Sequence, residues 1–512
     1  MSNPKTAPSV PKPVANNGWI RKSDLDAWLD RYLPVPTQIV SNEEFHPMLQ
    51  TPEQRRLEYE IESGVGREAL RTGMDRRQFL CSSCGMALAF AAMNTVYGKC
   101  FRVDAAELHN AAAVEANKTK FFIFDVQTHH VAMPQEIPHI DQLDQAFLDG
   151  IFSLRQQARS TNPALKDRVP RPEDLYLENY IKEVFLDSET DVVALSALPG
   201  SSEESDILTP DVIYRSRSWI NEVTSSPRVI SHGYFSPDLG QQNIEYMHAQ
   251  LEKIKIEAWK GYTGWPRAKG VDRWRLDDEK VAYPALQFAR KNGIRNICVH
   301  KGLPFPGDPS RWSPMDVPKA AVDFPDMNFL IYHSGFRTPE EVLPAARERF
   351  AKDSYVPWTS DLCAWKKKNP QVKNIHMEIG STFAVMVTAS PVLAAHVLGM
   401  IIDAFGADHV LWGTDSIWWG SPQWQIEAFR RLEMPEDLTK RFGWKPFTDD
   451  VKHKIFGLNA ARVYGIDPGA KRNPMPGDYV EKLRKAYKQS GLSAPSNTQY
   501  GWVRADSLAA SA

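Results

Sequence analysis

The sequence feature that most constrains the fold is a recurring run of apolar residues that ends in a histidine or an aspartate. It occurs as FFIFDVQTHH at Phe121–His130, NICVH at Asn296–His300, NFLIYH at Asn328–His333 and HVLWGTD at His409–Asp415. Short runs of this kind are typical of strands that are buried on both faces, as in parallel sheets. In a closed parallel barrel the carboxyl ends of the strands meet at one mouth, where the active sites of this architecture lie. The four polar ends are therefore predicted to converge.

The end of the first run carries three polar residues at alternate positions, Asp125, Gln127 and His129. Because side chains alternate along a strand, these three are predicted to share a face, and His130 is predicted to point the opposite way. A single histidine on an apolar strand can equally be a hydrogen-bonded core residue. Four such ends at corresponding positions favour a shared site, with His129 rather than His130 in it.

Strands and helices alternate from Lys118 onward. The predicted strands are Phe121–Val126, Val192–Leu198, Arg228–His232, Lys255–Lys260, Asn296–His300, Phe329–His333, Asn374–Ile379 and Val410–Gly413. The helices predicted between them include Leu175–Leu186, Asp211–Val223, Asp278–Lys291, Pro339–Phe350 and Pro391–Phe405. This order predicts an α/β protein built on a (β/α)8 TIM barrel. A doubly wound sheet would usually place a glycine-rich phosphate turn after its first strand, where this chain has Gln127 and His129.

Four parts are predicted along the chain. Residues 1–73 form an N-terminal extension, disordered over Met1–Asn17 and helical at Ser23–Leu33 and Glu53–Leu70. Residues 74–117 form an apolar segment and a linker, residues 118–468 form the barrel with a closing helix at Asp449–Val463, and residues 469–512 form a C-terminal tail. With 512 residues, of which 42% are hydrophobic, the chain has enough apolar material for one barrel with extensions.

The segment that begins at Arg76-Arg77 resembles a twin-arginine export signal. An apolar run, Cys81–Val96, follows the two arginines, and Val103–Ala116 offers cleavage sites. The expected location is therefore the periplasm. A charged segment of about seventy residues precedes the arginines, whereas a signal normally lies at the terminus, so the alternative is a buried helix that packs on the barrel of a cytoplasmic protein. The run is shorter than the about twenty residues that a membrane-spanning helix needs, and no stable membrane span is expected.

Charge and cysteine content exclude several classes of partner. The net charge is −2, with acidic and basic residues interspersed, so neither a nucleic acid nor a charged membrane surface is expected to bind. The five cysteines do not form a disulfide framework in a chain of this length. Cys298 is predicted to lie in the barrel core. The expected partner is a small-molecule substrate.

Seven motifs together resemble the amidohydrolase-related (amidohydrolase 2) family of the amidohydrolase superfamily, which includes aminocarboxymuconate-semialdehyde decarboxylase-like metal-dependent hydrolases. The resemblance covers Lys118 to Pro468. The motifs are DVQTHH, EAWKGYT at Glu257–Thr263, VHKGL at Val299–Leu303, YHSG at Tyr332–Gly335, HMEIGSTF at His376–Phe383, LWGTDS at Leu411–Ser416 and KIFGLNAARVYGI at Lys454–Ile466. The family normally carries His-x-His on the first strand, and here Gln127 takes the place of the first histidine. The resemblance also implies a homo-oligomer.

Two imidazoles and a carboxylate, from His129, His300 and Asp415, can hold one divalent metal ion and leave positions for water and substrate. Zinc is the first expectation, with manganese or iron as alternatives, and Gln127 would fill or hydrogen-bond the remaining position. The resemblance implies that Asp415 also accepts the proton of the metal-bound water. His333 would donate a proton or stabilise developing negative charge, as acid–base histidines do.

Other residues near the predicted mouth have alternative roles. In some superfamily members a lysine at the position of Lys260 is carbamylated and bridges two metal ions, and otherwise Lys260 would bind a substrate carboxylate. Glu378 is interpreted as a partner of the site residues or as a salt bridge of the barrel floor. Trp418 and Trp419 follow the eighth strand, and one of them is predicted to touch the substrate.

The predicted function is that of a metal-dependent hydrolase that cleaves a C–N or C–O bond of a small cyclic, lactone, ester or amide substrate. The same residues would serve a non-oxidative decarboxylase of an aromatic or unsaturated carboxylic acid. A third alternative is a metal-free binding or scaffold protein, in which Gln127 marks a lost site.

Overall fold

The computed structural model describes residues 19–29, 33–41, 47–132, 175–199, 206, 208–265, 274–303, 309–337, 344–470, 472 and 501–504. The predicted disorder of Met1–Asn17 and most of the predicted tail lie outside these residues. The two ends that are described meet, because β1 (Trp19–Arg21) pairs antiparallel with β10 (Trp502–Arg504). Helix α1 (Lys22–Leu29) follows β1 directly.

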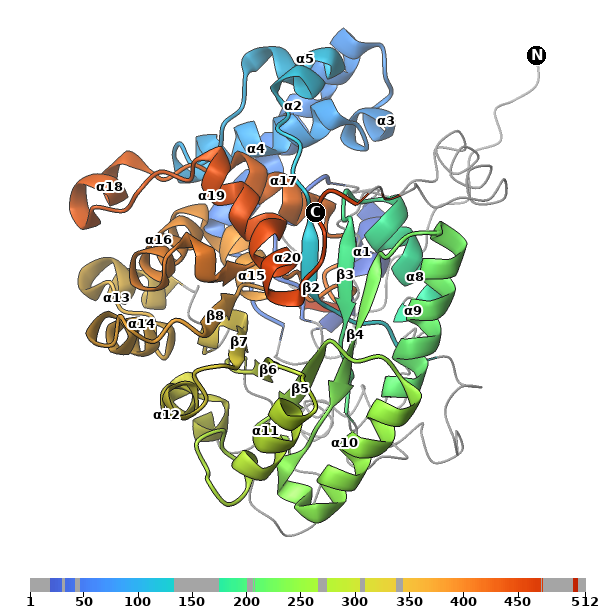
Figure 1. The fold of residues 1–512 in the computed structure, drawn as a ribbon. Coiled ribbons are helices and arrows are strands. Elements are labelled where there is room, and N and C mark those ends of the chain that lie inside the picture. The colour runs from blue at the N-terminus through green and yellow to red at the C-terminus, as the bar shows by residue number, and fades with distance from the viewer. Residues whose placement is uncertain are drawn as a thin grey trace.

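Eight parallel strands form the sheet at the centre of the molecule, and neighbours in the sheet are neighbours in the chain (Figure 1). The last strand lies beside the first, because the Val126 amide donates to the Trp412 carbonyl at 3.0 Å and the Asp415 amide to the Gln127 carbonyl at 3.0 Å. The predicted TIM barrel is confirmed. The strands are β2 (Phe124–Thr128), β3 (Val192–Leu195), β4 (Val229–Tyr234), β5 (Ala258–Tyr262), β6 (Asn296–His300), β7 (Asn328–Tyr332), β8 (Ile375–Glu378) and β9 (Val410–Leu411).

One apolar cluster fills the inside of the barrel. Its members come from every strand except β8, so they meet only in the barrel interior. They include Phe124, Val126, Ala194, Ile230, Ala258, Cys298, Leu330, Tyr332 and Leu411, joined by Ala460 and Tyr464 of helix α20 (Asn459–Tyr464). Cys298 thus lies in the core, as the sequence predicts.

The helices that follow the strands cover the outside of the sheet (Figure 1). Helix α16 begins where the Ser390 side chain accepts a hydrogen bond from the Leu393 amide, and Pro391 occupies its first turn, where a proline costs no hydrogen bond. Between the barrel strands lie α8 (Leu177–Ile181) with a π-helical turn (Lys182–Leu186), α9 (Pro210–Thr224), α10 (Gln241–Lys253), α11 (Ala282–Lys291), α12 (Val317–Asp323), α13 (Pro344–Asp353), α14 (Thr359–Lys368), α15 (Thr382–Ala389) and α16 (Pro391–Phe405). After β9 come α17 (Gln423–Arg431), α18 (Glu436–Phe442), α19 (Asp449–His453), a π-helical turn (Lys454–Leu458) and α20.

The N-terminal part forms a helical cap on the barrel, made of α2 (Pro52–Thr72), α3 (Arg76–Leu80), α4 (Ser83–Tyr97) and α5 (Ala111–Asn117) (Figure 1). Helix α2 begins with a capping box between Thr51 and Gln54. Gly64 lets α4 approach α2, because a Cβ atom there would lie 2.8 Å from Cδ1 of Leu88. The cap is fastened to the barrel beyond α4, where Arg431 pairs with the buried Glu107 at 2.7 Å.

The segment that resembles a twin-arginine signal is part of this cap. Its arginines begin α3, and its apolar run forms α4, whose Leu88, Phe90 and Met93 are buried. The structure therefore accommodates the run as a buried helix, and the location of the protein in the cell stays a prediction. Among the described residues, no helix is both long and apolar enough to cross a membrane.

Candidate active site

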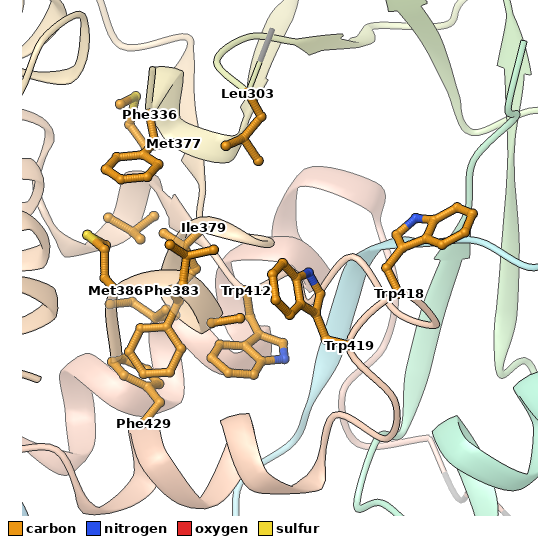
Figure 2. Packing of buried hydrophobic residues seen from close by; sticks show 14 of the residues in the cluster. Leu303, Phe336, Met377, Ile379, Phe383, Met386, Trp412, Trp418, Trp419 and Phe429 are labelled. Carbon is orange, nitrogen blue, oxygen red and sulfur yellow. The ribbon is translucent and has the colours of Figure 1, made fainter. Parts of the chain in front are cut away.

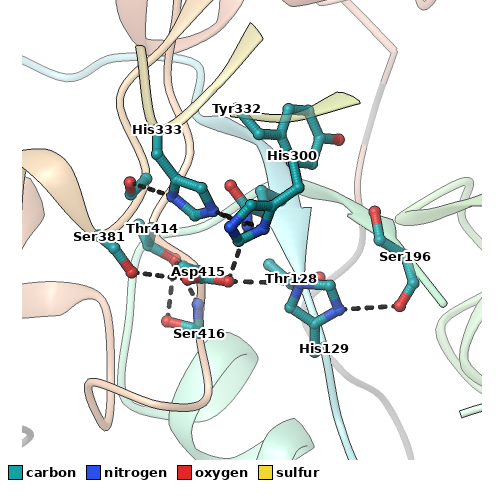
Figure 3. Close-up of polar contacts among 12 residues, drawn as sticks. Thr128, His129, Ser196, His300, Tyr332, His333, Ser381, Thr414, Asp415 and Ser416 are labelled. Atoms are coloured by element: carbon teal, nitrogen blue, oxygen red, sulfur yellow. Dashed lines mark hydrogen bonds and ion pairs between the residues drawn. The ribbon is translucent and has the colours of Figure 1, made fainter. Parts of the chain in front are cut away.

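Five predicted site residues lie at the carboxyl ends of the barrel strands and come together there, and Figure 3 shows four of them, His129, His300, His333 and Asp415. Gln127 is the second-to-last residue of β2, and His129 directly follows that strand. His300 is the last residue of β6, His333 directly follows β7, and Asp415 lies just past β9. All five side chains are buried. The convergence of strands whose residues are far apart in sequence produces a compact polar cluster at the barrel mouth.

Asp415 is the centre of this cluster. Its Oδ1 atom accepts a hydrogen bond from Gln127 Nε2 at 2.9 Å and lies 3.3 Å from His129 Nε2. Its Oδ2 atom accepts a hydrogen bond from Ser381 Oγ at 2.6 Å. Burial alone would raise the pKa of Asp415, but hydrogen bonding from His129 and the nearby His333 outweigh burial and lower the pKa to about 2. The carboxyl group is therefore held as an anion.

His300 and His333 face each other across the mouth. His333 Nδ1 lies 2.8 Å from the Gly380 carbonyl oxygen, and His300 Nε2 lies 3.2 Å from the Leu303 carbonyl oxygen. Since a carbonyl oxygen can only accept, each of these ring nitrogens carries a hydrogen. Burial lowers the pKa of His333 to about 4 and that of His300 well below its usual range, so both rings are neutral. The two remaining nitrogens, His333 Nε2 and His300 Nδ1, lie 3.3 Å apart, and Gln127 Nε2 lies 3.4 Å from His333 Nε2.

His129 is held in the same way from the opposite side of Asp415. Its Nδ1 atom donates to the Ser196 carbonyl oxygen at 2.8 Å. Its Nε2 atom faces Asp415 Oδ1 at 3.3 Å. The mouth thus gathers three imidazole rings and one carboxylate within a few ångströms of one another.

The backbone around the mouth is strained. His333, Ser381 and Asp415 have φ angles of 63°, 54° and 59°, in the left-handed region that disfavours side chains. Such residues cluster at functional sites, where the surrounding structure holds them. Here Glu378 Oε2 accepts the His333 amide hydrogen at 2.9 Å. Of the two roles considered for Glu378, the structure thus places it as a partner of the site residues, and burial raises its pKa to about 8.

Lys260 lies inside the barrel next to the same cluster. Its side chain is fully buried, with Nζ 3.5 Å from the ring centroid of Tyr332 and 4.8 Å from that of Tyr262. An ammonium group over an aromatic face is stabilised by the ring quadrupole. Its charge contributes to the lowered pKa values of His300 and His333, after burial. The carbamylated and carboxylate-binding roles of Lys260 both stay predictions.

Trp418 and Trp419 lie in the loop that follows β9 (Figure 2). The ring of Trp418 lies 6.5 Å from that of His129, centroid to centroid, so this indole borders the site. Trp419 instead donates its indole N–H to Ser381 Oγ at 2.8 Å. Contact with the substrate stays a prediction for both.

Three residues of the cluster were not predicted from the sequence. Ser196 contributes its backbone carbonyl oxygen and Ser381 its hydroxyl group, and no local sequence pattern identifies either residue. His232, on β4, hydrogen-bonds Ser196 Oγ at 2.7 Å and the Tyr464 hydroxyl at 3.0 Å, and burial lowers its pKa to about 3. It ends the predicted strand Arg228–His232, so the pattern of an apolar run that ends in histidine could have identified it.

The expected alternation along the first strand is interrupted. The pairing of β2 with β3 shifts register between Asp125 and Thr128, as at a β-bulge. The Oδ1 atom of Asp125 accepts the backbone amide hydrogens of Thr414 at 3.0 Å and of Gln127 at 3.1 Å. His130 points away from the mouth, as predicted, with Nε2 2.9 Å from Ser216 Oγ on α9.

Comparison with known proteins finds a family match for the second half of the barrel. Residues 264–466 match the family model Amidohydro_2, described as Amidohydrolase. This part of the chain belongs to the amidohydrolase family. The match begins just after β5 and ends two residues after α20, so it contains His300, His333 and Asp415. A search of curated protein sequences gave no match.

Solved structures similar to this chain are TIM-barrel proteins and enzymes. They include an uncharacterised TIM-barrel protein from Bordetella bronchiseptica, with 16% identity, a TM-score of 0.40 and coverage of 68% of this chain and 99% of that one. The 5-carboxyvanillate decarboxylase from Sphingomonas paucimobilis has 14% identity and a TM-score of 0.38, with coverage of 68% of this chain and 100% of that one. A probable 2-pyrone-4,6-dicarboxylic acid hydrolase from Acinetobacter baumannii has 10% identity and a TM-score of 0.38, with coverage of 67% of this chain and 99% of that one. Identities this low carry no substrate over to this chain.

Enzymes of the amidohydrolase family are typically metal-dependent, so the donor set must be tested for a metal ion. Within the described part of the chain, no three His, Cys, Asp or Glu side chains are grouped to hold one. An ion would therefore need Gln127 as a donor beside His129 and Asp415. Gln127 Oε1 fits this role, because it is buried without a hydrogen-bond partner. The imidazole rings and the Asp415 carboxylate beside it fit as well, since nitrogen and carboxylate donors of this kind bind zinc-like ions.

Proposed function

We propose that this amidohydrolase-family barrel is a metal-dependent hydrolase that cleaves a C–N or C–O bond of a small cyclic, lactone, ester or amide substrate. The observation that carries the proposal is the convergence of metal-binding groups at the mouth, where His129 Nε2 lies 3.3 Å from Asp415 Oδ1, His300 Nδ1 lies 3.3 Å from His333 Nε2, and Gln127 Oε1 is buried without a hydrogen-bond partner. His129, Asp415 and Gln127 would hold the ion, with His300 next to them. A bound divalent ion supplies a water of lowered pKa and polarises a carbonyl oxygen.

Asp415 and His333 would handle the proton of the attacking water. Ser381 holds Oδ2 of Asp415, so Oδ1 is the oxygen directed to the reacting water. His333 is neutral and has its hydrogen on Nδ1, so Nε2 must accept a proton before it can donate one. The proton from water thus passes to Asp415 or His333 Nε2 as the C–O bond to water forms. It is then delivered to the leaving nitrogen or oxygen as the scissile bond breaks.

A second candidate is non-oxidative decarboxylation of an aromatic or unsaturated carboxylic acid, and the position of Lys260 favours it. This lysine is a fully buried cation that lies close enough to contribute to the lowered pKa values of His300 and His333. A cation there would pair with a substrate carboxylate. Release of carbon dioxide from aromatic acids, without hydrolysis of esters, lactones or amides, would establish this candidate in place of the first.

The proposal is tested by elemental analysis of protein purified without added metal, with His300→Ala treated in parallel. We expect about one equivalent of zinc, manganese or iron in the native protein and a loss of that metal in the variant. Substrate screening on esters, lactones, amides and aromatic acids then assigns the reaction. About two equivalents would support a bridging Lys260. No metal in either protein, even after reconstitution, would overturn the proposal in favour of a metal-free binding protein.

Replacing Gln127 with histidine is expected to tighten zinc binding by about tenfold or more, because imidazole is a better zinc ligand than an amide. The dissociation constant is measured by competition with a chromogenic chelator. His130→Gln is the matched control, since its imidazole lies on the same segment but faces Ser216, away from the mouth. Equal affinity of Gln127→His and native protein would show that residue 127 does not contact the ion.

Export is a separate proposal, supported by the arginine pair at the start of α3, where Arg76 is exposed. Changing Arg76 and Arg77 to lysine is expected to retain the protein in the cytoplasm of a host that has a twin-arginine pathway. Cell fractionation measures the distribution. Lysine at Arg67 and Arg71, two largely exposed arginines of α2, provides the control. An unchanged distribution in both variants would favour the buried-helix interpretation.

A further inference from the structure

Two loops at the barrel mouth are joined by a chain of hydrogen bonds that ends on Asp415. Trp419 Nε1 lies 2.8 Å from Ser381 Oγ, and Ser381 Oγ lies 2.6 Å from Asp415 Oδ2. Ser381 follows β8, whereas Trp419 and Asp415 follow β9. All three side chains are at most 3% exposed, so water does not compete for these bonds.

The direction of the chain follows from the chemistry of its members. An indole N–H can only donate, so the Ser381 oxygen accepts from Trp419. A serine hydroxyl has one hydrogen, and the carboxylate of Asp415 can only accept, so this hydrogen goes to Oδ2. Donation from the indole polarises the hydroxyl and strengthens its bond to the carboxylate.

We propose that Ser381 and Trp419 are positioning residues that reserve Oδ2 of Asp415 and leave Oδ1 as the oxygen available to the ion and the reacting water. The proposal deepens the proposed function and rests on it, because it takes Asp415 as the working carboxylate. Without the Ser381 hydroxyl, the bond from Gln127 Nε2 to Oδ1, at 2.9 Å, would remain, but Oδ2 would have lost its donor and could turn toward the ion. Partners that orient a metal ligand in this way commonly contribute 10- to 100-fold in metal affinity, roughly.

The backbone supports this arrangement. Ser381 has a φ angle of 54°, and the left-handed conformation places its hydroxyl between the two loops. The loop that carries Trp419 is held in turn, because the Trp419 carbonyl accepts a hydrogen bond from the Trp424 indole at 3.3 Å. Trp419 is thus held at its backbone carbonyl and at its indole N–H, which distinguishes it from an aromatic side chain that only fills space.

The experiment measures zinc affinity of the full-length protein for Ser381→Ala, Trp419→Phe and the double variant. We expect Ser381→Ala to weaken zinc binding by about 10- to 100-fold and Trp419→Phe by about fivefold, as for one neutral hydrogen bond. In the Ser381→Ala background, Trp419→Phe should cost nothing further, because its effect passes through the hydroxyl. The control is Trp412→Phe, which removes a buried indole N–H that has no hydrogen-bond partner and should leave zinc affinity unchanged.

Additive effects, in which Trp419→Phe weakens zinc binding as much in the Ser381→Ala background as in the native protein, would overturn the proposal and assign Trp419 a packing role. A second readout needs no metal. In protein labelled with ¹⁵N in tryptophan, the indole resonance assigned by Trp419→Phe should shift in Ser381→Ala while that of Trp412 does not. If zinc does not bind at all but the resonance shifts, the hydrogen bonds exist and the proposed function fails. If zinc binds and neither variant changes its affinity, the positioning proposal fails and the proposed function stands.

Discussion

Alanine at Asp415 is expected to lower kcat/KM by at least about a thousandfold, the size of effect that loss of a residue acting in proton transfer produces. This residue is where Gln127, His129 and Ser381 converge, at 2.9, 3.3 and 2.6 Å from its two oxygens. Its removal takes away both the anion that would hold the ion and the acceptor for the proton of water. Metal content should fall together with activity.

The control is Asp408→Ala, at a half-exposed carboxylate just before β9 that pairs with Lys454 at 3.4 Å. It should change neither activity nor metal content. Because alanine at position 415 leaves buried donors without an acceptor, Asp415→Asn is made in parallel to preserve shape. Circular dichroism and thermal unfolding show whether each variant is folded. A folded Asp415→Asn protein with normal turnover would remove Asp415 from the reaction.

The sequence predicts elements best where local chemistry marks both ends. β6 and α16 have the predicted bounds, Asn296–His300 and Pro391–Phe405, since turn residues and a proline enclose them. β2 begins later than predicted, at Phe124. Phe121 belongs to the same apolar run but packs against the rings of His453 and Phe456, at 4.6 and 4.9 Å, instead of joining the sheet. Apolar composition alone does not distinguish these two kinds of burial.

The candidate site likewise contains residues that could be predicted from the sequence and residues that could not. Five residues at strand ends could be placed near one another from the sequence, because barrel geometry brings all the carboxyl ends together. The role of Ser381 could not be predicted, since it depends on Trp419 and Asp415 from another loop. The interruption of alternation at Asp125 also depends on a neighbouring strand. Likewise, the burial of α4 depends on tertiary packing, such as the close approach of Leu88 to Gly64, and the sequence alone could not predict it.

Alanine at Asp316 is expected to lower the stability of the protein by about 3 to 5 kcal/mol, because it leaves a buried charge without its partner. Lys301 is fully buried, and its Nζ lies 2.7 Å from Asp316 Oδ2 and 2.9 Å from Thr263 Oγ1. Burial lowers the pKa of Lys301, and the charge of Asp316 opposes this effect. At about 2 °C per kcal/mol for a large domain, Tm should fall by about 6 to 10 °C in differential scanning fluorimetry.

An exposed ion pair is the comparison for this effect. Glu436 and Lys440 on α18 approach to 2.6 Å but are 79% and 67% exposed, so Glu436→Ala should cost less than about 1 kcal/mol. Removing both buried charges, in Lys301→Met with Asp316→Leu, is expected to restore most of the lost Tm, since no charge then remains in the apolar interior. A small deficit should persist, because the Leu276 amide loses its acceptor, Asp316 Oδ2, at 2.8 Å. If Asp316→Ala lowers Tm no more than Glu436→Ala does, water reaches Lys301. The contacts of Lys301 then do not hold together the loops after β5 and β6 beside His300.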